Sequence, residues 1–158
     1  MKLLRVGELG SEIVAALDSN NVIRDLSDHI KDLNPQTINE ETLNKLKRIK
    51  LSELKKINSN IRIGSCISNP VDFLAIGLNY KAHAEGTKSK LPTEPIVFNK
   101  SSGCIQGPND QIVKPKSANK MDYEVEVGMI IGREGKYIKE ENAQDYVFGY
   151  CIVNDISE

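Results

Sequence analysis

The sequence predicts a protein built mainly of β-strands, with one amphipathic helix near the amino terminus. Strands are indicated by segment 121–132, whose first half alternates acidic and apolar residues, and by the apolar runs 73–78 and 146–155. The helix is indicated by Thr37 and Glu40, which have the spacing of a capping box ahead of an apolar helical face. The 158 residues are enough for one sizeable hydrophobic core or two small ones.

Composition excludes several classes of protein. The formal net charge is −1 and 27% of the residues are charged, with both signs present, which argues against a nucleic-acid or membrane-surface protein. No apolar stretch has the length of a signal peptide core or a membrane span. Cys66, Cys104 and Cys151 are far apart and lack C-x-x-C spacing, so we expect reduced thiols packed as small apolar side chains, and a cytoplasmic location.

Residues 1–68 are predicted to form a small domain. Segment 2–6 has the pattern of a strand, and segments 12–17 and 22–26 form a hairpin around the Asn- and Asp-rich turn 18–21. The helix that follows presents Leu43, Leu46 and Ile49 on one face. A polar, poorly periodic stretch then leads to a domain boundary near residues 65–69, and 69–158 form the second domain.

Two carboxylates on the alternating strand suggest a metal site. Glu124 and Glu126 are two residues apart, so both project from one strand face, where like charges cost free energy unless solvent or a cation compensates them. Asp155 ends an apolar run, and a buried carboxylate there would need a partner. Oxygen ligands suit Mg²⁺, Mn²⁺ or Ca²⁺. The alternatives are a solvated strand face for the glutamates and a turn or cap role for Asp155.

Polar residues follow the core strand 73–78 directly, and sites are often built at such positions. His83 in this segment has an ordinary pKa suited to a general base, with a surface histidine as the alternative. Lys100, at the end of a strand over 96–100, could bind an anionic substrate or simply face solvent. A further short strand is expected over 111–114.

Five motifs follow one another along the chain: GLNYxxH (77–83), EPIVFxK (94–100), GPND (107–110), DYEVE (122–126) and GYxxVNDIS (149–157). In this order and spacing they resemble the fumarylacetoacetate hydrolase family, and more narrowly its bacterial two-domain branch. That branch includes ureidoglycolate lyases and 2,4-diketo-3-deoxy-sugar-acid hydrolases. The opening residues and the stretch 23–27 also resemble the small amino-terminal domain of the branch.

The resemblance implies an α+β fold, in which a mixed β-roll with few helices follows a small α+β amino-terminal domain. It implies a homodimer. Family catalytic domains continue well beyond the position of Glu158, so we expect this chain to be the amino-terminal part of a longer protein, by truncation, gene splitting or an incomplete gene model.

The resemblance also implies a site. Glu124, Glu126 and Asp155 match the family's metal ligands, for Mg²⁺ or Mn²⁺ with Ca²⁺ as an alternative, and the cation would bind a 2-oxo acid and stabilise an enolate. His83 would activate water. Its glutamate partner in the family stands where this chain has Gly86, so Glu85 is the candidate replacement. Three residues are expected to bind substrate: Asn79, Tyr80 and Lys100.

The expected function is therefore a divalent-metal-dependent hydrolase or lyase that cleaves a C–C bond in a 2-oxo or β-diketo acid of the acylpyruvate type. A ureidoglycolate lyase or an oxaloacetate decarboxylase would share every motif. An alternative of another class is a non-catalytic metal-binding fragment that works only with a second polypeptide.

Overall fold

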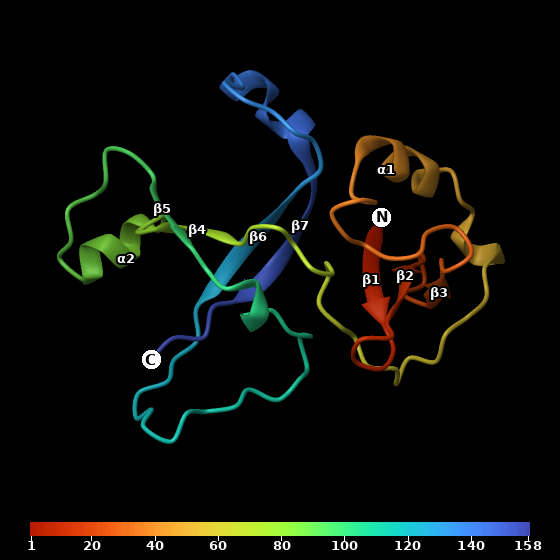
Figure 1. Cartoon of the computed structure of the whole chain (residues 1–158), viewed down its shortest axis with the longest axis horizontal. Coiled ribbons are helices and arrows are strands. Elements are labelled where there is room, and N and C mark those ends of the chain that lie inside the picture. Colours follow the sequence, from red (N-terminus) through yellow and green to blue (C-terminus); the bar gives the residue numbers. More distant parts are fainter. The chain divides into compact units, whose positions relative to one another are not determined.

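The computed structural model describes all of residues 1–158 and mixes α and β structure (Figure 1). Every strand pair is antiparallel, in one three-stranded sheet and two two-stranded sheets. The chain forms two compact units, one of residues 1–68 with 106–158 and one of residues 69–105. These units are not the two domains expected from the sequence, and that domain assignment stays a prediction. No helix is long and apolar enough to cross a membrane.

The first unit begins with the sheet β1-β2-β3, formed by Lys2–Val6, Ile13–Leu17 and Ile23–Asp25. The expected strand and hairpin are therefore confirmed. The turn between β2 and β3 is held by Asp18, whose Oδ1 accepts hydrogen bonds from the backbone nitrogens of two later turn residues at 2.8 and 3.0 Å. An Asp at the start of a tight turn commonly bonds the backbone in this way, which is why the sequence located the turn correctly.

Helix α1 spans Glu40–Lys47 and is capped by Asn39, whose Oδ1 accepts a hydrogen bond from the Thr42 nitrogen at 2.9 Å. The expected capping box at Thr37 is wrong. The Thr37 hydroxyl instead donates to the Asp32 carbonyl and holds the turn that precedes the helix. Leu46 is fully buried, and Ile49 packs against the same core from just beyond the helix.

Two apolar clusters form the core of residues 1–68, and both include residues of β2. Ile130 and Phe148 from the later part of the first unit pack against the larger cluster. The buried members of the two clusters are Val14, Ala16, Leu26, Ile30, Leu33, Ile38 and Leu46 in one, and Val6, Ala15 and Ile23 in the other. The core therefore reaches from the first sheet and α1 to the hairpin described below.

An ion network also joins the two stretches of the first unit. Arg62 donates to both carboxylate oxygens of Asp110, at 2.8 and 2.6 Å, and to Glu12 at 2.8 Å. Arg5, which is 6% exposed, lies 3.3 Å from Glu12. Burial would raise the pKa of Glu12, but its hydrogen bond from Arg62 and the charge of Arg5 hold this pKa below its usual value. The network fixes the loop 107–110 against residues 1–68.

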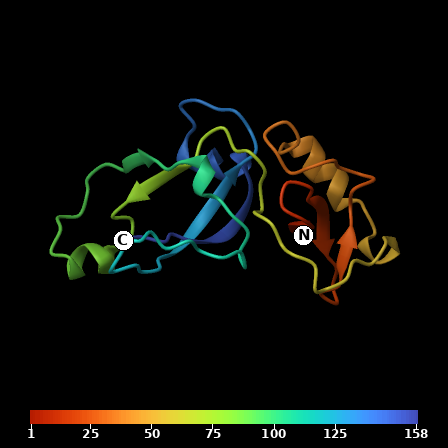
Figure 2. The same cartoon turned by 60° about the horizontal axis from the view of Figure 1, so that its bottom comes forward.

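The antiparallel hairpin of β6 (Val125–Ile131) and β7 (Val147–Asn154) completes the first unit (Figures 1 and 2). A register shift marks a bulge between Ile130 and Ile131. The inner face of the hairpin is half-buried and comprises Glu126, Gly128, Ile130, Gly149, Cys151 and Val153. Its outer face is exposed and comprises Val125, Val127, Met129, Ile131, Tyr150 and Ile152.

The expectation that segment 146–155 is a buried strand is therefore wrong for this chain, because only one of its faces is covered. The short strand expected over 111–114 is absent, and that segment is irregular. Cys66 and Cys104 are exposed rather than packed as apolar side chains, and Cys151 is half-buried, while all three cysteines are free thiols as expected.

The second unit holds β4 (Leu74–Gly77), α2 (Lys81–Gly86) and β5 (Ile96–Asn99), with β4 and β5 paired antiparallel. Both strands were expected, but β4 is not buried, since Leu74 is 58% exposed. Three 3₁₀ turns complete the chain, at Leu51–Glu53, Ser102–Cys104 and Glu140–Tyr146.

Candidate metal centre

The three acidic residues expected to bind metal lie together at one end of the β6–β7 hairpin. The ladder pairs Glu126 with Val153 and continues beyond the strands to a bridge between Asp122 and Ser157. Within this register Asp155 lies opposite Glu124, and its backbone nitrogen donates to the Glu124 carbonyl at 2.8 Å. Residues opposite each other in an antiparallel pair share a face, as do residues two apart. Glu124, Glu126 and Asp155 therefore occupy neighbouring positions on the inner face.

The side chains on this face are not gathered into a ready site. Glu124 is exposed, whereas Glu126 and Asp155 are half-buried. No group of three or more His, Cys, Asp or Glu side chains lies close enough together to hold a metal ion. The backbone positions and the oxygen-only donors nevertheless suit a hard divalent cation, which is the group that compensates neighbouring carboxylates. The residues present thus fit such a cation in the chemistry of their donors and in their shared strand face, while their side chains are not drawn together in this structure.

The expected catalytic pair lies on α2 in the second unit. His83 and Glu85 are both exposed, and Glu85 Oε1 is 3.8 Å from Lys81 Nζ, one helical turn earlier. Residues two apart on a helix do not face each other. Helix α2 therefore does not by itself bring Glu85 to His83. A joint role for the two residues stays a prediction.

The expected substrate-binding residues lie at opposite ends of the β4–β5 ladder. Asn79 and Tyr80 follow β4, and Tyr80 has the extended backbone of the α2 N-cap. Lys100 follows β5, where its nitrogen donates to the Phe73 carbonyl at 2.7 Å, and its Nζ lies 5.4 Å from the Phe98 ring. The register pairs Gly77 with Ile96, so the second unit separates Lys100 from the other two residues by the length of the ladder.

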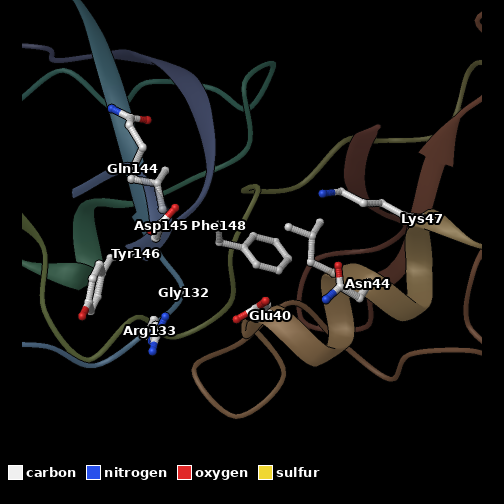
Figure 3. A pocket seen from close by; sticks show the side chains of 11 residues that line it. Glu40, Asn44, Lys47, Gly132, Arg133, Gln144, Asp145, Tyr146 and Phe148 are labelled. Atoms are coloured by element: carbon white, nitrogen blue, oxygen red, sulfur yellow. The ribbon is translucent and has the colours of Figure 1, made fainter. Parts of the chain in front are cut away.

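A groove that sequence reasoning missed lies at the other end of the hairpin (Figure 3). Its volume is about 380 Å³, and it is lined by Glu40, Leu43, Asn44, Lys47, Gly132, Arg133, Gln144, Asp145, Tyr146, Val147 and Phe148. Phe148 extends toward α1, and the Arg133 guanidinium lies 5.0 Å from the Tyr146 ring centre. The lining combines α1 with β7 and the loop after β6, a combination that no local pattern indicates. The expected site residues do not line this groove.

Comparison with known proteins identifies the family. Residues 72–158 match the model of the carboxy-terminal region of fumarylacetoacetate (FAA) hydrolase. A protein of Burkholderia ambifaria named "Putative hydrolase" is 45% identical over 158 residues, which is all of this chain and 56% of that protein. The chain therefore spans a little more than half the length of this relative.

Solved structures agree with this result. Maleylpyruvate hydrolase from Sphingobium sp. SYK-6, in complex with manganese(II) and pyruvate, matches with a TM-score of 0.77 and 21% identity over 99% of this chain and 58% of that chain. A probable 2-hydroxyhepta-2,4-diene-1,7-dioate isomerase from Mycobacterium abscessus matches with a TM-score of 0.69 and 28% identity, over 99% and 52% of the two chains. The chain belongs to the fumarylacetoacetate hydrolase family.

Proposed function

We propose that the protein is a divalent-metal-dependent hydrolase or lyase that cleaves a C–C bond in a 2-oxo or β-diketo acid of the acylpyruvate type. The observation that carries this proposal is the placement of Glu124, Glu126 and Asp155 on one hairpin face, inside the segment that matches the family. The manganese and pyruvate bound to the Sphingobium hydrolase support the same chemistry. A mixed β-roll and a homodimer belong to the proposal and rest on the family resemblance. A cytoplasmic location also belongs to it and rests on the three scattered cysteines.

The three carboxylates would hold Mg²⁺ or Mn²⁺. When bound, the cation supplies a Lewis acid that stabilises negative charge on a substrate oxygen. The remaining roles fall to the chain's own side chains. His83 accepts a proton from the attacking water, and Lys100 binds the substrate carboxylate through its ammonium group. Asn79 and Tyr80 orient the substrate through hydrogen bonds from their side chains.

The test is release of pyruvate from an acylpyruvate by the full-length natural protein, with and without Mn²⁺. Cleavage that requires the metal and is lost in Glu126→Gln, but kept in Glu94→Gln, supports the proposal. Oxaloacetate and ureidoglycolate, assayed alongside, separate C–C hydrolysis from decarboxylation and from C–N cleavage. Metal binding without turnover of any substrate would favour a non-catalytic metal-binding protein instead.

A further inference from the structure

The groove between α1 and the hairpin is separate from the candidate metal centre. The β6–β7 ladder runs from the pair Val125–Asn154, beside the three acidic residues, to the pair Ile131–Val147, and Val147 lines the groove. At roughly 3.3 Å per residue, the length of this ladder places the two sites roughly 20 Å apart. A small molecule in the groove would therefore not touch a substrate bound at the metal.

One wall of the groove is a single face of α1. This helix presents four residues to the groove: Glu40, Leu43, Asn44 and Lys47. Residues three, four and seven positions apart lie on the same side of a helix, so these side chains form one stripe. Leu43 is half-buried near the middle of the stripe, while the charged residues at its two ends are exposed. The wall therefore offers apolar surface next to an acid at the amino-terminal end of the helix.

The opposite wall forms where the loop after β6 meets the start of β7. The Gly132 nitrogen donates to the Tyr146 carbonyl at 2.9 Å and joins the two strands of this wall. A Cβ built on Gly132 would come within 2.8 Å of the Phe148 Cβ, so a larger residue there would displace Phe148, which extends toward α1 (Figure 3). The Arg133 guanidinium lies 5.0 Å from the Tyr146 ring centre, where the ring attracts the cation. This wall therefore presents an aromatic ring and a positioned cation to the groove.

Glu40 and Arg133 line the groove from opposite walls and do not pair with each other. Neither residue takes part in an ion pair of this structure, although both border the same volume of about 380 Å³. An acid and a base on facing walls are complementary to a ligand that carries an ammonium and a carboxylate group. The volume lies at the small end of the range of ligand pockets, which is roughly 300–1,000 Å³. The groove therefore suits one small molecule with both charges and an apolar part.

We propose that this groove binds a free α-amino acid with an apolar side chain. The Glu40 carboxylate accepts hydrogen bonds from the ammonium group of the ligand, and the Arg133 guanidinium donates to its carboxylate. The apolar side chain of the ligand packs against Leu43 and Phe148. Glu40 repels a ligand that carries only a carboxylate, and Arg133 repels one that carries only an ammonium group, so the groove selects a zwitterion. This binding is independent of the metal chemistry proposed above.

The test is calorimetric titration of the full-length natural protein with L-phenylalanine in the absence of divalent metal. We expect saturable binding, and binding at least ~10-fold weaker for 3-phenylpropionate and for phenethylamine, which keep the ring and each lack one charge. Glu40→Gln and Arg133→Met should each weaken phenylalanine binding to a similar extent. The matched controls lie outside the groove and should bind as the parent does. They are Glu41→Gln, the other acid in the first turn of α1, and Lys136→Met, a cation 5.1 Å from the Tyr137 ring.

Absence of saturable phenylalanine binding by the parent protein would overturn the proposal. The same conclusion would follow if either single-charge analogue bound as tightly as phenylalanine, or if Glu40→Gln and Arg133→Met kept the affinity of the parent. The titration needs neither metal nor turnover, so its result does not depend on whether the protein is the proposed hydrolase.

Discussion

Gly86 occupies the position on α2 three residues after His83, where the family resemblance places a glutamate. Residues three apart on a helix are neighbours on one face. Nothing lies within 4 Å of a Cβ built on Gly86, so a longer side chain fits there without strain from its surroundings. A carboxylate at this position could orient the imidazole and stabilise its protonated form.

Gly86→Glu in the full-length protein should therefore raise hydrolysis of an acylpyruvate several-fold, since general-base catalysis contributes ~10²–10⁴-fold in total. Decarboxylation of oxaloacetate needs no activated water and should change little. Steady-state kinetics on both substrates measure this, with Gly86→Gln as the control of equal size that lacks the charge. An equal change in both reactions, or the same gain in the Gln variant, would contradict these roles.

The sequence predicted the position of a residue well where that position depends only on neighbouring residues in the chain. The common face of Glu124 and Glu126 follows from the strand period and was predicted. The position of Asp155 opposite Glu124 depends on the pairing of two strands across the long connection from Ile131 to Val147, which no local pattern fixes. The sequence suggested Asp155 as a third ligand only because an unpaired buried carboxylate is costly, and the family resemblance then matched it to a ligand position.

At the scale of elements, two residues that suit the N-cap of α1 lie only two positions apart in the sequence. Thr37 and Asn39 both suit an N-cap, and the helix uses Asn39 because Thr37 is held by the Asp32 carbonyl in the preceding turn. The sequence predicted where the paired strands lie, but it did not predict how deeply their side chains are buried. Apolar content indicated coverage on both faces of β7, whereas coverage depends on what packs against the hairpin.

Asn39→Ala should lower the free energy of unfolding by about 1 kcal/mol, because the first turn of α1 loses the acceptor for the Thr42 nitrogen. Urea unfolding followed by circular dichroism measures the loss. Asn20→Ala is the control, because Asn20 contributes only its backbone nitrogen to the turn between β2 and β3 and should stay near the parent value. Equal stability of the parent and Asn39→Ala would show that the cap contributes nothing.

At the scale of the whole molecule, the ion network should make stability depend on pH. The hydrogen bonds from Arg62 hold the pKa of Asp110 below its usual value. A carboxyl with a lowered folded-state pKa contributes fully above its unfolded pKa of about 4, and this contribution is lost as pH falls through the lower folded value. The urea concentration at the unfolding midpoint should therefore fall as the pH is lowered below about 4.

Arg62→Met should lower the midpoint near neutral pH and flatten this drop, because Asp110 and Glu12 lose their shared partner. Lys50→Met is the control. Its ion pair with Glu53 is exposed on both sides, so its removal should change little. If the urea midpoint depends on pH in the same way in the parent and in Arg62→Met, the network does not contribute to the pH dependence of stability.

The outer face of the hairpin gives the isolated chain a tendency to associate. It is a contiguous apolar surface, with Val127 68% and Ile152 82% exposed, and such surfaces on soluble proteins promote association. Ile152→Lys should reduce the associated fraction in size-exclusion chromatography with light scattering, whereas Val113→Lys in an irregular segment should not. A monodisperse parent chain would contradict the expected association.

Titration of the protein with Mn²⁺ by calorimetry tests the proposed function most directly, because substrate cleavage as proposed depends on the carboxylates of the hairpin's inner face. We predict saturable binding that weakens at least ~10-fold in Glu124→Gln, Glu126→Gln and Asp155→Asn. Glu94→Gln, which changes an exposed acid in the second unit, should bind as the parent does. Equal affinity in all four variants would contradict the metal site and with it the proposed function.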